Sequence, residues 1–128
     1  MKLLLDTHTF IWWDSEPSKL PSKVLASCQN KENTLIISVA SVWEMQIKSQ
    51  LGKMKLSLPL EELIGSQNKI NKIKILPIIL EHILALEKLP SYHKDPFDRL
   101  LIAQANTENA TLVSCDSVFN NYSVSLMW

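Results

Sequence analysis

The chain has 128 residues, of which 46% are hydrophobic and 20% are charged, with thirteen basic residues against thirteen acidic ones. This length and balance are typical of one globular domain with a buried core, and they exclude a disordered chain and a general polycation. Because no apolar run approaches the roughly 20 residues that span a bilayer, we expect a single domain over residues 1–128 that contacts no membrane.

The first half of the chain predicts two buried strands and three helices. Three leucines at residues 3–5 form a short apolar strand, and Asp6 interrupts this run too early for a signal peptide, so we expect a cytoplasmic protein. Helices are predicted at residues 10–13 and 21–29, followed by an apolar strand at 34–38 and a helix at 39–49. Ser38 is placed to cap this last helix, although Ser41 and Glu44 also fit a capping box.

The second half continues the alternation of helices with strands. It predicts helices at 60–68, 78–88 and 96–107, strands at 73–76 and 111–114, and a weaker strand at 123–127. Asp95 followed by Pro96 is a typical helix start, with a capping residue and then proline at the first helical position. Strands that alternate with helices favour right-handed crossovers and a parallel sheet. We therefore predict a three-layer α/β fold with a short central parallel sheet of four to five strands and helices on both faces.

Four acidic residues lie far apart in the chain at places that such a fold brings together. Asp6 and Asp116 each follow a predicted strand, while Glu44 and Asp98 lie near helix N-termini. Each has an ordinary explanation, as a turn former, a cap or a partner of the helix dipole. Strand ends and helix N-termini nevertheless share one edge of a parallel sheet, where such folds form their ligand crevice. Crowded carboxylates repel one another unless a cation neutralises them, and hard oxygen ligands suit Mg²⁺ or Mn²⁺.

The remaining candidate side chains give weaker signals. His8 is close enough to Asp6 to border the predicted site, but it is more typical of a polar loop residue. His82 is expected to be structural, and His93 can hydrogen-bond the Asp95 cap that follows it. Cys28 and Cys115 form no Cys-x-x-Cys pair, so we expect buried free thiols. The tryptophans are more typical of core or oligomer contacts than of base stacking.

The segment from residue 48 to residue 74 is rich in lysine and has only two acidic residues, Glu61 and Glu62. Its six lysines are at positions 48, 53, 55, 69, 72 and 74. Such a stretch either holds phosphates beside an acidic centre or forms a solvated face.

The order of these motifs resembles that of the PIN-domain ribonucleases, and within them the VapC-like toxins of bacterial toxin–antitoxin pairs. The first two matching segments are Leu3-Leu4-Leu5-Asp6-Thr7-His8 and Ile37-Ser38 through Trp43-Glu44. The third, and the most specific, runs from His93-Lys94-Asp95-Pro96-Phe97-Asp98 to Ala105. The fourth is Leu112-Val113-Ser114-Cys115-Asp116 with Phe119. Together they span nearly the whole chain in the family's order.

The resemblance implies a function as well as a fold. It implies an endoribonuclease that depends on Mg²⁺ or Mn²⁺ and cuts RNA with four acids, which fall on Asp6, Glu44, Asp98 and Asp116. Of these, we expect Asp6, Asp98 and Asp116 to hold the metal. We expect support from Ser114 near the metal, from Asp95 as a helix cap, and from Arg99, which either contacts RNA or forms a structural ion pair. The resemblance also implies a homodimer and a small cognate antitoxin that blocks the acidic groove.

Two other classes of function stay open on the residues alone. A non-catalytic module that binds RNA or a protein partner would keep the sheet and the lysines and tolerate loss of the acids. A phosphotransfer domain of the haloacid-dehalogenase type is disfavoured, because it needs a second aspartate two residues after the first, where this chain has His8. Metal-dependent cleavage separates the nuclease from the binding module.

Overall fold

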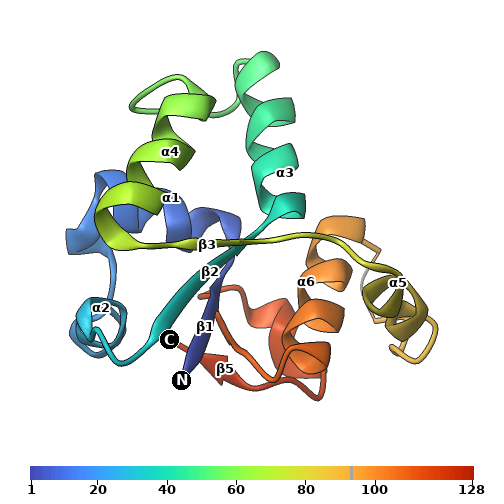
Figure 1. The fold of residues 1–128 in the computed structure, drawn as a ribbon. Coiled ribbons are helices and arrows are strands. Elements are labelled where there is room, and N and C mark those ends of the chain that lie inside the picture. Colours follow the sequence, from blue (N-terminus) through green and yellow to red (C-terminus); the bar gives the residue numbers. More distant parts are fainter. Residues whose placement is uncertain (93) are drawn as a thin grey trace.

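The computed structural model describes residues 1–92 and 94–128, so the expected contact of His93 with the Asp95 cap lies outside the described residues. Figure 1 shows the arrangement of the helices and strands. In chain order they are β1 (Lys2–Leu5), α1 (Thr7–Ser15), the 3₁₀ helix η1 (Pro17–Lys19), α2 (Ser22–Gln29), β2 (Thr34–Ser38), α3 (Val39–Gln50), α4 (Leu60–Asn71), β3 (Lys74–Leu76), α5 (Leu80–Leu86), α6 (Pro96–Thr107), β4 (Thr111–Val113), the 3₁₀ helix η2 (Ser117–Asn121) and β5 (Leu126–Met127).

The sheet has five strands in the order β3-β2-β1-β4-β5. Every neighbouring pair is parallel, with Leu5 of β1 beside Ile37 of β2 on one side and Val113 of β4 on the other. From β1 the chain first builds the sheet outward through β2 and β3, then returns to add β4 and β5 on the opposite side. The prediction of a short parallel sheet is confirmed.

Alternate side chains of β1 point into two different cores. Leu3 and Leu5 pack with side chains from α1, α2, α3 and α4, whereas Leu4 packs with side chains from α6 and η2. All three leucines are fully buried. A strand covered on both faces accounts for the unbroken apolar run at the start of the chain. The predicted three-layer α/β architecture is therefore confirmed.

Capping residues account for some of the differences between predicted and observed helix ends. Helix α1 begins at Thr7, earlier than the predicted residue 10, because the Asp6 carboxylate accepts a hydrogen bond from the Thr9 amide at 2.9 Å. Helix α3 begins directly after Ser38, whose hydroxyl accepts from the Ala40 amide at 3.0 Å. The cap at Ser38 is thus confirmed over the capping box at Ser41.

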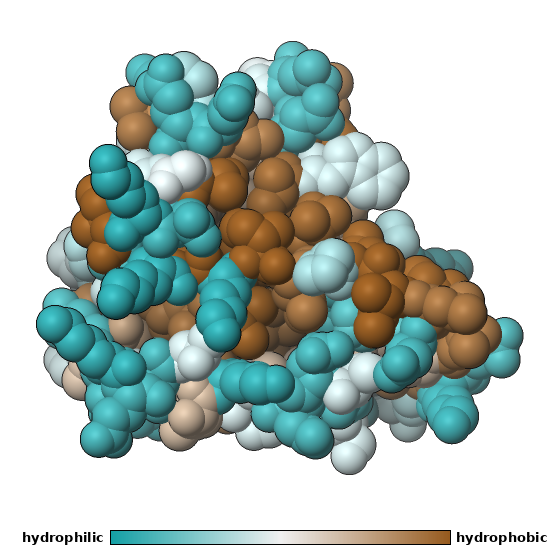
Figure 2. All heavy atoms as spheres, viewed as in Figure 1, coloured by the Kyte–Doolittle hydropathy of each residue, from teal (hydrophilic) through white to brown (hydrophobic). Residues whose placement is uncertain are grey.

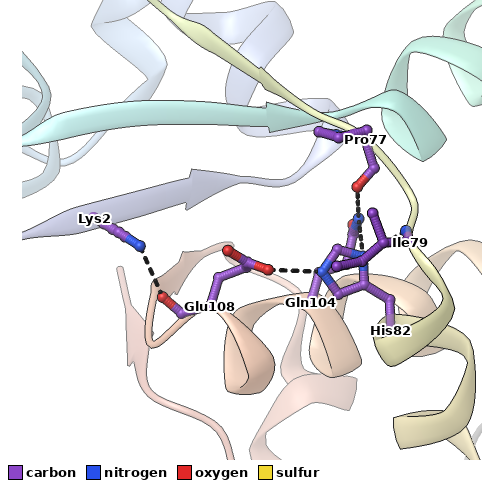
Figure 3. Close-up of polar contacts among 6 residues, drawn as sticks. All are labelled: Lys2, Pro77, Ile79, His82, Gln104 and Glu108. Atoms are coloured by element: carbon purple, nitrogen blue, oxygen red, sulfur yellow. Dashed lines mark hydrogen bonds and ion pairs between the residues drawn. The ribbon is translucent and has the colours of Figure 1, made fainter.

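A buried histidine joins α5 to α6, as Figure 3 shows. His82 is fully buried, and its Nδ1 accepts a hydrogen bond from the Ile79 amide at 3.1 Å. The ring therefore carries its proton on Nε2, which lies 2.9 Å from Oε2 of Glu108. The side-chain amide of Gln104 lies 3.3 Å from Nδ1 and 3.3 Å from the Pro77 carbonyl oxygen. The expectation of a structural role for His82 fits this arrangement.

Replacing His82 by leucine is expected to lower the free energy of unfolding by about 3 kcal/mol, because it leaves buried polar partners unsatisfied. Urea unfolding monitored by circular dichroism measures the change. The same substitution at the exposed His8 is the matched control, with an expected change within about 0.5 kcal/mol. Equal unfolding midpoints for the two variants would contradict this account of the α5–α6 contact.

The surface over α5 is unusually apolar for an exposed helix. Ile79, Leu80, Ile83 and Leu84 are between 41% and 69% exposed, and Figure 2 shows apolar side chains gathered over α5 at the right of the view. Across the ranges that the structure describes, every helix is too short or too polar to span a bilayer.

Candidate active site

The candidate site lies at the carboxyl ends of β1 and β4, where the order of the strands reverses. β1 and β4 are neighbours, yet the chain leaves β1 toward β2 and leaves β4 toward β5. Asp6 directly follows β1, and Asp116 follows β4 after two residues. The segments that leave these strands diverge, which opens a crevice at the carboxyl ends of parallel strands. The Asp6 amide donates to the Val113 carbonyl oxygen at 3.2 Å, so the two loops begin in contact.

Asp6 serves both as a helix cap and as a member of the site. Its Oδ1 accepts from the Thr9 amide, while its Oδ2 accepts from the Ser114 hydroxyl at 2.5 Å. The Ser114 oxygen in turn accepts from the Asp116 amide at 3.1 Å. Only 8% of Asp6 and 6% of Ser114 are exposed. Ser114 therefore joins the two loops and fixes the direction in which the Asp6 carboxylate faces.

Glu44 is held by two different elements. It lies in the second turn of α3, and its Oε1 accepts from the Thr7 hydroxyl at 2.5 Å. Its Oε2 lies 2.9 Å from the Lys48 ammonium, one turn further along the same helix. The Glu44 side chain is 12% exposed. Both of its oxygens therefore have a partner, and one of those partners, Thr7, comes from the start of α1.

At the start of α6, Asp95 is the helix cap, as predicted. The Asp95 carboxylate accepts from the amides of Phe97 and Asp98 at 2.8 and 3.2 Å, with Pro96 at the first helical position. Asp98 lies in the first turn of the helix and lines the same pocket as Asp6. Because Asp95 supplies the cap, the Asp98 side chain is not needed to start the helix.

One pocket of about 300 Å³ brings all four acids together. Its lining residues are Asp6, Thr7, His8, Trp12, Glu44, Asp98, Cys115 and Asp116. The acids come from four segments that are distant in sequence, namely the end of β1, the second turn of α3, the first turn of α6 and the loop after β4. Asp116 also caps η2, since its Oδ1 accepts from the Val118 amide at 3.1 Å. The ordinary capping role and the shared pocket therefore coexist at Asp6 and Asp116.

The basic residues that the sequence pointed to are spread over different places. Arg99 donates to the carbonyl oxygens of Pro90 and Leu86 at 2.8 and 3.4 Å, which joins α6 to the end of α5. Lys72 and Lys74 line a separate cleft of about 590 Å³ near the amino-terminal ends of β2 and β3. Of the six lysines, Lys48 is the one placed beside the acidic pocket, through its ion pair with Glu44.

The two cysteines have different surroundings, and the expectation of a buried thiol is wrong for Cys115. Cys28 is buried, which raises its pKa to about 11. Cys115 is exposed and lines the acidic pocket. Desolvation of the thiol raises the pKa of Cys115, and the negative charges of Asp6 and Asp116 add to this effect. Its position directly between Ser114 and Asp116 is the sequence signal that could have placed it there.

The acidic side chains of the pocket have the right chemistry for a hard divalent cation, but they are not arranged as a ligand shell. Carboxylate oxygens are the donors that Mg²⁺ and Mn²⁺ prefer. Within residues 1–92 and 94–128, however, no group of three or more His, Cys, Asp or Glu side chains is arranged to hold a metal ion. The carboxylates therefore share a pocket without forming a ready ligand shell among the described residues.

The chain matches a known protein family and is similar to a curated ribonuclease. The sequence model described as "PIN domain" matches residues 3–124. A curated relative, Ribonuclease VapC22 of Mycobacterium tuberculosis, is 27% identical over 115 residues, which cover 89% of this chain and 86% of the relative.

Solved structures share the fold at lower identity. One chain, from the crystal structure of VapBC2 of Rickettsia felis bound to a DNA fragment from their promoter, has a TM-score of 0.74 at 19% identity. That alignment covers 99% of this chain and 98% of the other. A chain of VapBC-1 from nontypeable Haemophilus influenzae has a TM-score of 0.64 at 17% identity, with coverages of 99% and 97%.

Proposed function

Because this chain belongs to the PIN domain family, we propose that it is a Mg²⁺- or Mn²⁺-dependent endoribonuclease that hydrolyses RNA phosphodiester bonds. The observation that carries this proposal is the shared pocket, in which Asp6, Glu44, Asp98 and Asp116 converge from four distant segments. Such a concentration of negative charge is unfavourable unless it has a cationic ligand. The name of the curated relative, a ribonuclease, supports the same chemistry.

We assign the metal to Asp6, Asp98 and Asp116, with Glu44 at the edge of the pocket. A divalent ion bound there would neutralise charge on the scissile phosphate and make a water molecule more acidic. Ser114 holds the Asp6 carboxylate through its hydroxyl. Glu44 offers a carboxylate oxygen that accepts a hydrogen bond from the attacking water. Water would attack phosphorus as the bond from phosphorus to the 3′ oxygen breaks, and the 3′ oxygen would leave with a proton. The expected ends are therefore a 5′-phosphate and a 3′-hydroxyl.

We propose that the protein acts as the toxin of a toxin–antitoxin pair in the cytoplasm. The similarity to chains of VapBC complexes supports a small antitoxin as its partner. The exposed apolar side chains of α5 (Figure 2) are consistent with a further protein contact, and we propose a homodimer. We also propose that residues 1–128 act as one such domain, since the family match covers residues 3–124.

A non-catalytic module that binds RNA or a partner protein on the same fold is the second candidate. It is favoured by the lack of a ready metal-binding group among the residues that the structure describes. The two candidates differ in one measurable property, because only the nuclease converts RNA into shorter products when metal is added.

Purified protein free of antitoxin is expected to cut structured RNA in millimolar Mn²⁺ or Mg²⁺ and to stop when EDTA is added. Gel analysis of end-labelled RNA measures the cleavage. In parallel, the divalent ion is expected to raise the melting temperature by several degrees, since it binds only the folded carboxylates. Buffer without divalent ions, brought to the same ionic strength with sodium chloride, is the control. RNA binding without cleavage would favour the binding module. An unchanged melting temperature would contradict the proposal that this pocket binds the metal.

A further inference from the structure

We infer that Thr7 and Lys48 form a clamp that positions Glu44 in the acidic pocket. This inference rests on the proposed function, because it assigns two positioning residues to the same site. Neither residue is among the acids that the sequence motifs single out. The clamp follows from three observations, which concern the contacts of Thr7, the contacts of Lys48 and the charge around Glu44.

The position of Thr7 is fixed by its burial and by its place at the start of α1. It is 3% exposed and is the first residue of α1, directly after the Asp6 cap. A threonine side chain has few rotamers, since its β-carbon is branched. Its hydroxyl has a single proton, and that proton goes to Oε1 of Glu44 at 2.5 Å. The turn that fixes Asp6 therefore also fixes one oxygen of Glu44, across 37 residues of sequence.

Lys48 holds the other oxygen from outside the pocket. Its ammonium lies 2.9 Å from Oε2 of Glu44, and its side chain is 35% exposed. The pair has the favourable order, with the acid four residues before the base on one helix. An exposed pair of this kind contributes little, but the Glu44 side chain is only 12% exposed. Lys48 is absent from the residues that line the pocket, so it restrains Glu44 without occupying the space for substrate.

The charge around Glu44 explains why a clamp is needed. Asp6, Asp98 and Asp116 line the same pocket, and like charges repel one another at short range. A free glutamate side chain would rotate away from this repulsion toward solvent. Two donors on two different elements, the N-terminus of α1 and the third turn of α3, hold the carboxylate at the pocket instead. The clamp thus sets the distance of Glu44 from the other acids before substrate arrives.

The test compares substitutions that delete each contact with substitutions that keep it. Thr7→Val removes the hydroxyl at constant shape, while Thr7→Ser retains it; Lys48→Met removes the charge, while Lys48→Arg retains it. We expect each deletion to lower kcat for RNA cleavage by about 10- to 100-fold with little change in KM, since misplacing a reacting group by about 1 Å has an effect of this size. The serine and arginine variants are expected to recover most of the rate. The control is Lys88→Met, because Lys88 is exposed and is not among the residues that line the pocket. This variant is expected to match wild type.

Thermal unfolding gives a readout that does not depend on cleavage. In a Glu44→Ala background the clamp has nothing to hold, so adding Thr7→Val or Lys48→Met is expected to shift Tm less than it does in wild type. An active wild type with unchanged kcat in both deletion variants would overturn the clamp and leave the nuclease intact. The clamp would also be overturned if the Tm shifts depend on Glu44 but kcat does not fall. That result would show that the contacts are purely structural. A wild type that cuts no RNA with either metal would instead refute the proposed function, and the clamp with it.

Discussion

Replacement of Asp98 by asparagine is expected to lower the rate of RNA cleavage by about a thousandfold or more while leaving the fold unchanged. Asparagine has the same shape as aspartate but lacks the charge that a divalent ion needs. Asp98 lines the acidic pocket, whereas the start of α6 is capped by Asp95. The helix therefore keeps its cap in the variant. Single-turnover cleavage of labelled RNA measures the rate, and circular dichroism with thermal unfolding checks the fold.

The matched control for this substitution lies three residues earlier on the same helix start. Asp95→Asn changes the same charge, but asparagine caps helices about as well as aspartate. We expect its cleavage rate to stay within a few-fold of wild type and its melting temperature to change little. Equal and severe losses in both variants would attribute the effect to the helix N-terminus as a whole. Full cleavage by Asp98→Asn would remove that carboxylate from the mechanism.

Alkylation of Cys115 with N-ethylmaleimide is expected to abolish cleavage in the folded protein. The thiol is exposed and lines the pocket beside Asp6 and Asp116, so the added group fills space that RNA would enter. Cys28 is buried, and we expect one thiol to react in native protein and two in denaturant. Mass spectrometry counts the adducts, and the cleavage assay follows after removal of excess reagent.

The reaction of Cys115 is expected to depend steeply on pH. Desolvation, assisted by the charges of Asp6 and Asp116, raises its pKa, and the thiolate is the form that reacts. A raised pKa leaves less thiolate at a given pH, so alkylation in EDTA at pH 7 to 8 should be slower than for free cysteine. The rate should rise about tenfold per pH unit until the pH passes the pKa. A Cys115→Ser variant that keeps its cleavage rate after treatment confirms the site of action, whereas its inactivation would refute it.

The fold could largely be predicted from the sequence because its periodic signals are strong. The ranges for β2 and α6 are confirmed to the residue, since each is bounded by a cap, at Ser38 and Asp95. Helix α1 was predicted too short because Thr7 and Thr9 are polar residues that are nevertheless buried. The predicted final strand is reduced to Leu126–Met127, because a short edge strand has one partner and little pattern of its own.

The location of the four acids was predictable for a general physical reason, but their contacts were not. Parallel strands place their ends at one edge, so residues that follow strands meet there whatever their spacing. By contrast, the hydrogen bond from Thr7 to Glu44 joins side chains from two helices that no periodicity relates. Cys115 was expected to be buried because cysteine usually is. The loop after β4 exposes it instead.

The strand order determines when the acidic pocket can form during synthesis of the chain. During synthesis the N-terminal strand emerges first, but its neighbour β4 is made only after residue 110. Ribosomes add roughly 5–20 residues each second, so several seconds separate the two partners. Throughout that interval the nascent chain lacks β4 and Asp116, so the acidic pocket is incomplete. The pocket can therefore be completed only after β4 and Asp116 have been made, and the topology itself supplies that delay.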